Sequence, residues 1–250
     1  MLASMAGKVA LVVGGSSGIG QATALAFARH GAQVVIASRR IAKMTETIRQ
    51  IQEIRGEAIF VPTDVTKASD IAALVDKTVK EYGRLDYAFN NAEVGTSSAS
   101  LVDLSEEEWD YTVAVNLKGI WLSLKYQIPA MLATGGGAIV NMASVGGIIG
   151  ASGLAVYSAT KAGVIGLSRV AALEYAKANI RINAISPSGI TTETFLKLPA
   201  DVRAHIEAAN PIGRLGIPRE IADAVVWLCS DEASFMLGQN LIIDGGATAQ

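Results

Sequence analysis

The sequence predicts an α/β fold: a doubly wound parallel sheet of about seven strands with helices on both faces. Short apolar segments alternate with longer amphipathic segments along the whole chain. A glycine-rich turn joins the first apolar segment to the first amphipathic one. The 250 residues, 50% of them hydrophobic, contain no linker, repeat or low-complexity stretch. A single domain over residues 1–250 is therefore expected.

Strands are predicted where apolar residues run without alternation, which is typical of a parallel sheet covered on both faces. They are expected at 9–13, 33–37, 58–61, 85–89, 138–142, 180–185 and 241–244. Helices are expected at 19–30, 42–54, 69–82, from about 105 onward, 157–178 and 219–230. The segment 191–211, with two prolines and mixed polarity, is interpreted as a substrate lid; a plain surface helix is the alternative.

Composition excludes several classes of partner. A formal net charge of -2 gives no electrostatic reason for binding nucleic acid or an anionic membrane. The single cysteine, Cys229, excludes an internal disulfide, suits a reducing compartment and is expected to be buried. The apolar run 9–13 is too short for a signal peptide, and no stretch approaches the roughly 20 residues that span a bilayer. A cytoplasmic protein is expected, with no metal site.

The first candidate site is the turn after strand 9–13. Its glycines let backbone N–H groups approach a pyrophosphate, and the following helix presents the positive end of its dipole. The spacing is G-x-x-x-G-x-G rather than G-x-G-x-x-G. We expect a dinucleotide cofactor here, the alternative being a tight turn without a ligand. The expected contacts are Gly14, Ser16, Ser17, Gly18, Ile19 and Gly20.

The end of the second strand predicts which dinucleotide binds. An acidic residue at this place would bind the ribose 2′-hydroxyl of NAD. Here the chain has Ser38, Arg39 and Arg40, so no carboxylate repels a 2′-phosphate and two guanidinium groups can hold one. NADP(H) is therefore favoured over NAD(H). The alternative is that both arginines only begin a solvated helix.

Polar residues follow other predicted strands. Asp64 is expected to accept a hydrogen bond from the adenine amino group, to cap the next helix, or both. Asn90 and Asn91 are expected to satisfy backbone groups of neighbouring loops. Asn116 lies in an apolar stretch, where an amide without partners would be costly, so a role in a polar network is expected.

Three further side chains are expected to converge on one point. Ser144 follows the strand 138–142, and a glycine-rich loop leads from it into a helix. Tyr157 and Lys161 are four residues apart and therefore lie one turn apart on the same helix face. An unreactive pair on an amphipathic helix is the alternative interpretation.

Together these motifs resemble the single-domain short-chain dehydrogenase/reductases, a family of Rossmann-like enzymes, over nearly the whole chain. The resemblance is carried by Gly14, Gly18, Gly20, Asp64, Asn90, Asn91, Ala92, Asn116, Ser144, residues 157–161, Asn183, Pro187 and residues 244–246. It implies a catalytic tetrad of Asn116, Ser144, Tyr157 and Lys161, and a homotetramer or homodimer. Further cofactor contacts are expected at Asp64, Val65, Asn91, Ala92, Tyr157, Lys161, Pro187, Ile190 and Thr192, the last at the nicotinamide carboxamide.

The resemblance implies hydride transfer between a nicotinamide cofactor and a ketone or secondary alcohol. Tyr157 would be the general acid in reduction and the general base in oxidation. The Lys161 ammonium and the oxidised nicotinamide are expected to lower the pKa of Tyr157 well below its ordinary value of about 10. Ser144 would orient the substrate oxygen, Lys161 would hold the nicotinamide ribose, and Asn116 would position a water in a proton relay.

The chain departs from the family pattern at three positions. Val13 replaces a threonine that braces the loop after the fourth strand, Glu93 replaces a glycine in that loop, and Ser188 replaces a glycine after Pro187. The brace is therefore in doubt. For Glu93 we expect a side chain that points to solvent; the alternative is that it lines the active-site mouth and favours cationic or hydroxylated substrates.

The substrate is expected to be a hydrophobic ketone or alcohol. The candidate pocket walls are apolar: Ile148, Ile149, Leu154, Phe195 and Leu196. Two alternatives to an NADPH-dependent carbonyl reductase remain. One is an NAD-dependent dehydrogenase of a sugar, polyol or steroid alcohol, and the other is a regulatory protein that binds the cofactor without turnover.

Overall fold

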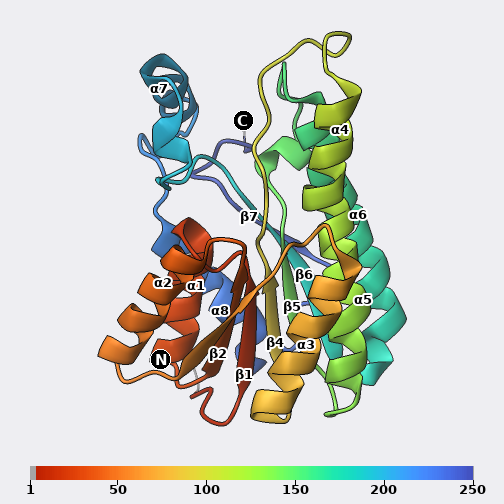
Figure 1. Cartoon of the computed structure of the whole chain (residues 1–250). Coiled ribbons are helices and arrows are strands. Elements are labelled where there is room, and N and C mark those ends of the chain that lie inside the picture. The colour runs from red at the N-terminus through yellow and green to blue at the C-terminus, as the bar shows by residue number, and fades with distance from the viewer. Residues whose placement is uncertain (1–3, 250) are drawn as a thin grey trace.

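Seven parallel strands form one sheet in the order β3-β2-β1-β4-β5-β6-β7 (Figure 1). The computed structural model describes residues 4–249. The strands are β1 (Val9–Val13), β2 (Gln33–Ser38), β3 (Ala58–Pro62), β4 (Tyr87–Asn90), β5 (Gly137–Met142), β6 (Ile180–Pro187) and β7 (Asn240–Ile243). The predicted doubly wound parallel sheet is confirmed.

Helices cover both faces of the sheet (Figure 1). They are α1 (Gly18–Arg29), α2 (Ile41–Glu53), α3 (Ala68–Tyr82), α4 (Glu106–Val113), α5 (Gly119–Leu132), α6 (Ala155–Tyr175), α7 (Ala200–Ala208) and α8 (Pro218–Cys229). Successive side chains of a strand point to opposite faces. In β1, Ala10 and Val12 pack in the core under α1 and α8, whereas Val9, Leu11 and Val13 pack in the core under α3, α5 and α6. Burial on both faces explains the unbroken apolar runs.

Three elements differ from the sequence prediction. The fourth strand begins at Tyr87 rather than 85 and ends at Asn90, which still pairs with Val13 and Asn141. The long helix from 105 is interrupted by a π turn, Ala114–Lys118, between α4 and α5. Helix α6 starts at Ala155, so Tyr157 lies in its first turn.

The order of the strands creates a crevice beside β1. The chain moves from β1 outward to β2 and β3, then returns to place β4 on the other side of β1. The connections after β1 and β4 therefore leave in opposite directions, which opens a space at their carboxyl ends. Gly14 follows β1 and Asn91 follows β4, so the predicted cofactor residues lie on both sides of this crevice.

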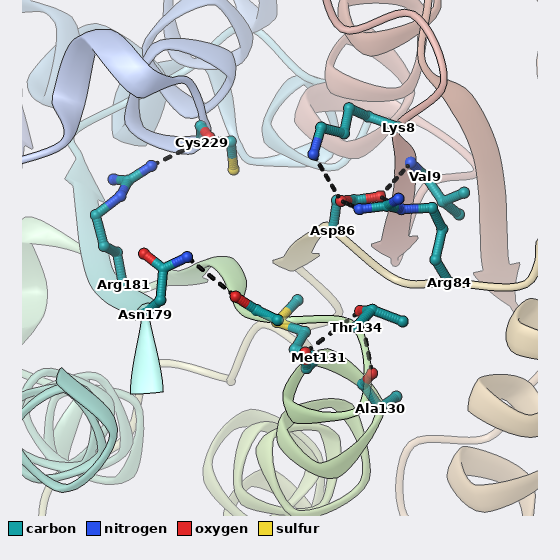
Figure 2. A network of polar contacts seen from close by, with 11 residues as sticks. Lys8, Val9, Arg84, Asp86, Ala130, Met131, Thr134, Asn179, Arg181 and Cys229 are labelled. Atoms are coloured by element: carbon teal, nitrogen blue, oxygen red, sulfur yellow. Dashed lines mark hydrogen bonds and ion pairs between the residues drawn. The ribbon is translucent and has the colours of Figure 1, made fainter. Parts of the chain in front are cut away.

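The opposite, amino-terminal edge of the sheet carries a polar network (Figure 2). Asp86, 3% exposed, accepts hydrogen bonds from Lys8 Nζ at 3.1 Å, Val9 N at 3.0 Å, Arg84 Nε at 2.7 Å and Arg84 Nη2 at 2.5 Å. Burial alone would raise the pKa of Asp86, but Arg84, Val9 and Lys8 together hold it below its ordinary value. These bonds tie the start of β1 to the start of β4.

We predict that Asp86→Asn lowers the free energy of unfolding by about 2 kcal/mol, because hydrogen bonds to a charged group contribute about 1.5–3 kcal/mol. A pKa lowered on folding stabilises the native state above the unfolded-state value of about 4. That stabilisation is lost as the pH falls through the lowered pKa of Asp86. Urea denaturation should therefore show a gap between wild type and variant at pH 7 that narrows below about pH 4. Asp76→Asn, at an exposed position of α3, is the control; an equal loss there would contradict the prediction.

Candidate active site

The glycine turn packs directly against the loop after β4. Gly14 has a φ of 87°, and a Cβ atom there would lie 2.7 Å from Ala92 N. A Cβ atom at Gly20 would lie 2.1 Å from the Gly14 carbonyl oxygen and 2.8 Å from Asn91 Nδ2. Neither contact is possible for a larger residue. These two glycines let the turn after β1, the start of α1 and the β4 loop meet.

A groove of about 310 Å³ opens along this junction, and we call it the strand-end groove. Its lining residues are Gly14, Ser17, Gly18, Ile19, Ala37, Ser38, Arg39, Arg40, Thr63, Asp64, Val65, Asn91, Ala92, Glu93, Val115, Thr192 and Thr194. Most of the predicted cofactor contacts are among them. The predicted contacts outside the lining are Ser16, Gly20, Tyr157, Lys161, Pro187 and Ile190.

The start of α1, at the edge of the groove, is suited to binding the phosphates of a dinucleotide. Gly18 has a φ of 55° and begins α1, and the methyl group of Thr192 lies over it, 3.1 Å from where a Cβ atom would be. Ser17 precedes the helix and, within the described part of the chain, its side chain makes no capping hydrogen bond. The first amides of α1 therefore face the groove without a side-chain acceptor, which is the arrangement that binds phosphate.

Serine and arginine side chains gather at the β2 end of the groove. Arg40 Nη2 donates to Ser16 Oγ at 3.0 Å and to Ser17 Oγ at 2.7 Å, and Ser16 and Ser38 hydroxyls lie 2.9 Å apart. Arg39 has a different partner: it donates to the hydroxyl of Tyr111 on α4 at 3.3 Å. The two arginines therefore have different surroundings, which the sequence did not distinguish.

Asp64 forms a turn of its own. Its Oδ1 accepts hydrogen bonds from Thr66 N at 3.1 Å and Thr66 Oγ1 at 2.8 Å. Burial would raise the pKa of Asp64, but the bonds from Thr66 and the charge of Arg39 hold it below its ordinary value. The carboxylate stays ionised and lines the groove. Asp64 therefore stabilises the turn before α3. It does not cap the helix, because the residue at the N-cap of α3 is Lys67.

Asparagines fix the loop after β4. Asn91 Nδ2 donates to the Gly14 carbonyl oxygen at 3.1 Å, and Asn91 N donates to the Val13 carbonyl oxygen at 2.9 Å. Asn90 pairs with Gln127 and Asn141 in the core. The brace that seemed doubtful with Val13 in place of threonine is therefore made by the backbone of Val13 and the side chain of Asn91.

Asn116 anchors the same loop three residues further on, at Val94. Its Oδ1 accepts from Val94 N at 2.8 Å and its Nδ2 donates to the Val94 carbonyl oxygen at 2.9 Å. Asn116 is 1% exposed and lies in the π turn, which places its amide opposite Val94. The predicted buried network is confirmed, although its partner is loop backbone.

Ser144, Tyr157 and Lys161 come together as predicted. Ser144 Oγ and Tyr157 Cε1 lie 3.5 Å and 3.4 Å from where a Cβ atom of Gly146 would be, and Lys161 Nζ lies 5.4 Å from the centre of the Tyr157 ring. The 3₁₀ turn Val145–Gly147 brings Ser144 to α6, because a Cβ atom on Gly147 would lie 2.6 Å from the Lys161 carbonyl carbon. Lys161 is 1% exposed and also donates to the Met142 carbonyl oxygen at 3.2 Å.

The prediction that Glu93 points to solvent is wrong. Its Oε2 lies 2.5 Å from Lys161 Nζ, while 43% of its side chain remains exposed on the groove side. The loop after β4 runs over α6 at this point, since Asn91 and Asn116 hold the residues on either side of it. Glu93 and Lys161 are 68 residues apart, a pairing that no local spacing indicates.

The side chains around Tyr157 do not by themselves lower its pKa. Burial and the Glu93 carboxylate raise the pKa of Tyr157, and together they outweigh the Lys161 ammonium and the Ser144 hydrogen bond, which lower it. Burial lowers the pKa of Lys161, but Glu93 and Tyr157 raise it further, so Lys161 stays protonated. Glu93 offsets the positive charge of Lys161, which was expected to lower the pKa of Tyr157.

The remaining predicted residues lie around the segment after β6. Pro187 ends β6 beside Ile243, and Ile190 is buried and bridges to Gly216. Ser188 Oγ donates to Asn210 Oδ1 at 3.0 Å, so it ties β6 to the end of the 191–211 segment. That segment contains a 3₁₀ turn, Phe195–Lys197, and α7. An ion pair between Lys43 and Glu193 links it to α2 across the groove.

The sequence did not single out four residues that line the groove: Ala37, Thr63, Val115 and Thr194. Ala37 and Thr63 adjoin predicted strand ends, so their position was the available signal. Between residues 4 and 249 there is no cluster of histidine, cysteine or acidic side chains suited to a metal ion. The same range holds no helix long and apolar enough to cross a membrane.

Known proteins resemble this chain over nearly its whole length. Residues 13–248 match the family model described as enoyl-(acyl carrier protein) reductase. The chain is 42% identical to cis-4-hydroxycyclohexanecarboxylate dehydrogenase of Sinomonas cyclohexanicum, with 98% of each chain covered. It is 40% identical to cyclohexanol dehydrogenase of an Acinetobacter species, covering 97% of this chain and 96% of the other.

A solved structure gives the same result. The crystal structure of levodione reductase superposes with a TM-score of 0.93 at 35% identity, covering 98% of both chains. The relatives are dehydrogenases and reductases, and each likeness covers at least 96% of both chains. The chain belongs to the short-chain dehydrogenase/reductase family of NAD(P)-dependent oxidoreductases.

Proposed function

We propose that this enzyme is an NADPH-dependent reductase of hydrophobic ketones that also oxidises the corresponding secondary alcohols. One observation carries the proposal. Ser144, Tyr157 and Lys161 meet beside the strand-end groove: Ser144 Oγ and the Tyr157 ring both lie against Gly146, and Lys161 Nζ is 5.4 Å from the centre of that ring. A proton donor, an oxygen-orienting hydroxyl and a buried ammonium are what carbonyl reduction requires.

In the proposed reaction, the bound nicotinamide supplies the hydride that adds to the carbonyl carbon. Tyr157 gives its phenolic proton to the carbonyl oxygen as the alcohol forms, and takes a proton from the alcohol in the reverse direction. Ser144 orients the substrate oxygen toward Tyr157. Lys161, which stays protonated, would stabilise the phenolate left behind and hold a ribose hydroxyl. A relay through Asn116 would use its backbone carbonyl, because both side-chain groups bind Val94.

The residues proposed to hold the cofactor are those of the groove together with Ser16 and, at the ribose, Lys161. The first amides of α1 would bind the pyrophosphate, and Asp64 and Val65 would flank the adenine. Thr192, which lies over Gly18, would contact the nicotinamide carboxamide. The segment 191–211 would act as the lid, held near α2 by the Lys43–Glu193 ion pair.

The preference for NADP(H) is supported by the cluster of Arg40, Ser16, Ser17 and Ser38. Three hydroxyls and a guanidinium meet at the β2 end of the groove, where a 2′-phosphate would lie. Such a donor set suits a phosphate better than a hydroxyl. Arg40 is the better candidate for this contact, because Arg39 is bonded to Tyr111.

The substrate class is supported by exposed apolar side chains on the loop after Ser144 and on the 191–211 segment. Ile148 and Ile149 follow the 3₁₀ turn after Ser144 and are 41% and 46% exposed; Leu196 of the 191–211 segment is 51% exposed. These side chains suit an uncharged, hydrophobic ligand. The relatives named for cyclohexanol and hydroxycyclohexanecarboxylate favour an alicyclic ketone or alcohol.

The protein is further proposed to be a cytoplasmic homotetramer or homodimer. Helices α5 and α6 expose Trp121 at 44%, Val170 at 54% and Leu173 at 77% on their outer surfaces. Apolar groups of this size on the surface favour a covering partner, and a second copy is the partner that the family suggests.

We predict that Tyr157→Phe lowers turnover of a cyclic ketone with NADPH at least 1,000-fold, since the proton donor is removed. Cofactor affinity, measured by quenching of protein fluorescence, should change less than about threefold. Tyr175→Phe, at the far end of the same helix, is the control and should retain wild-type turnover. Undiminished turnover by Tyr157→Phe would rule out the proposed mechanism.

Arg40→Ala should weaken NADPH binding about 10- to 100-fold, because a charge-assisted hydrogen bond to phosphate contributes about 1.5–3 kcal/mol. NADH binding should change little. Arg39→Ala should have the smaller effect of the two, and Arg49→Ala, whose guanidinium pairs with Glu46 and Glu53 on α2, should have none. Isothermal titration calorimetry of the wild type and each variant with NADPH and with NADH measures these affinities. Tighter binding of NADH than NADPH by the wild type would instead support an NAD-dependent dehydrogenase.

Leu173→Glu should convert the oligomer to smaller species if α6 forms the subunit contact. A buried, unpaired carboxylate in an apolar interface is strongly unfavourable. Light scattering coupled to size-exclusion chromatography gives the mass of both forms. A monomeric wild type would contradict the proposed assembly.

A further inference from the structure

Glu93 makes a contact with the proposed catalytic group that the reaction itself does not require. Its carboxylate lies 2.5 Å from Lys161 Nζ, and Lys161 is almost completely buried whereas Glu93 is partly exposed. Lys161 has one other acceptor, the Met142 carbonyl oxygen at 3.2 Å. Glu93 therefore provides the only negative charge bonded to Lys161 in the range 4–249.

The position of Glu93 is fixed by its neighbours. Asn91 is bonded to both Val13 and Gly14, and Val94 is bonded through its N–H and its carbonyl to Asn116. The backbone on each side of Glu93 is thus anchored to the core. Only the rotation of the Glu93 side chain remains to be set, and the ammonium of Lys161 supplies a partner for it. This is a built contact rather than a mobile surface pair.

We propose that Glu93 is a positioning residue that neutralises the charge of Lys161 and so keeps Tyr157 in its protonated, proton-donating form. The inference rests on the proposed function, because it assigns Tyr157 the acid/base role. If Tyr157 stays protonated, the pH ranges of reduction and oxidation differ. Reduction, which uses the phenol, would continue to higher pH, and oxidation, which uses the phenolate, would begin only under alkaline conditions.

The electrostatic argument follows from the sign of each charge. A lone Lys161 ammonium beside Tyr157 would favour the phenolate. With a carboxylate bonded to that ammonium, the pair has almost no net charge, so most of this preference is lost. The direction of the Tyr157 pKa agrees: burial and Glu93 raise it, and Lys161 and Ser144 only partly compensate.

Other charged groups around α6 are placed elsewhere. The acidic side chains of α4 are mostly exposed, and Glu108 accepts a hydrogen bond from Ser97 N at 2.7 Å. Lys118 of the π turn is exposed, and Arg181 of β6 donates to carbonyls at the end of α8. The 3₁₀ turn Val145–Gly147 and strand β5 contain no ionisable side chain. Within the described chain, the charges that act on Tyr157 are those of Glu93 and Lys161.

The test measures ionisation of Tyr157 directly in the cofactor-free protein. Ultraviolet difference absorbance follows phenolate formation with pH, and subtraction of the matched Tyr157→Phe protein isolates Tyr157 from the other tyrosines. Glu93→Gln removes the charge and keeps the shape, Glu93→Asp retains a carboxylate, and Glu106→Gln changes an exposed acid in the first turn of α4 as the control.

Glu93→Gln should lower the midpoint of the Tyr157 titration by about one pH unit, a tenfold change in proton affinity. The rising limb of kcat/KM for alcohol oxidation should move to lower pH by a similar amount. Glu93→Asp should restore at least part of the wild-type midpoint, and Glu106→Gln should leave it unchanged. A charge-independent structural role for Glu93 would change rates without moving either midpoint.

A Glu93→Gln midpoint equal to or above that of the wild type overturns the inference, as does a variant in which no Tyr157 titration is resolved. In that case inactive Tyr157→Phe protein would leave the proposed function standing. Turnover by Tyr157→Phe would refute the proposed function itself, and with it the role assigned to Glu93. The two failures are read from different variants and are therefore distinguishable.

Discussion

The contact between the ends of β1 and β4 is the constraint on which the site depends. Two parallel strands whose connections diverge must still be joined at their carboxyl ends, and here Asn91 and the backbone of Val13 and Gly14 make that joint. Gly14 lets Ala92 approach within van der Waals distance. The joint sets the width of the groove on one side and the path of the loop that carries Glu93 on the other. The groove and the cluster of Ser144, Tyr157 and Lys161 therefore share one support.

The two edges of the sheet serve different purposes. At the amino-terminal edge, buried Asp86 and the guanidinium of Arg181 satisfy backbone and charged groups, and every partner of those bonds belongs to the protein. At the carboxyl edge, amides at the start of α1 and the arginine–serine cluster face a groove. The amides at the start of α1 can face the groove without a side-chain acceptor, because the opposite edge and the two cores hold the strands in place.

Sequence reasoning recovered the sheet, its helices and the meeting of Ser144, Tyr157 and Lys161, because each depends on local pattern. Apolar runs mark strands, and parallel strands bring their ends to one edge, so Ser144, Tyr157 and Lys161 could be placed together. The carboxylate of Glu93 could not, because its partner is chosen by the path of a loop held from Asn116, a residue on another element. The different partners of Arg39 and Arg40 could not be predicted for the same reason, since Tyr111 lies far along the chain from Arg39.

The π turn at Ala114–Lys118 places Asn116 where it can hold Val94. A π turn contains one residue more than the α-helical turn it replaces. Deleting a residue here would let α4 and α5 merge into an unbroken helix, a change that favours helical regularity. It would also rotate Asn116 by about 100° about the helix axis, relative to the helix on one side of the deletion. Helical regularity and active-site geometry are therefore in direct competition at this position, and a family member that lost the extra residue would need another way to hold its β4 loop.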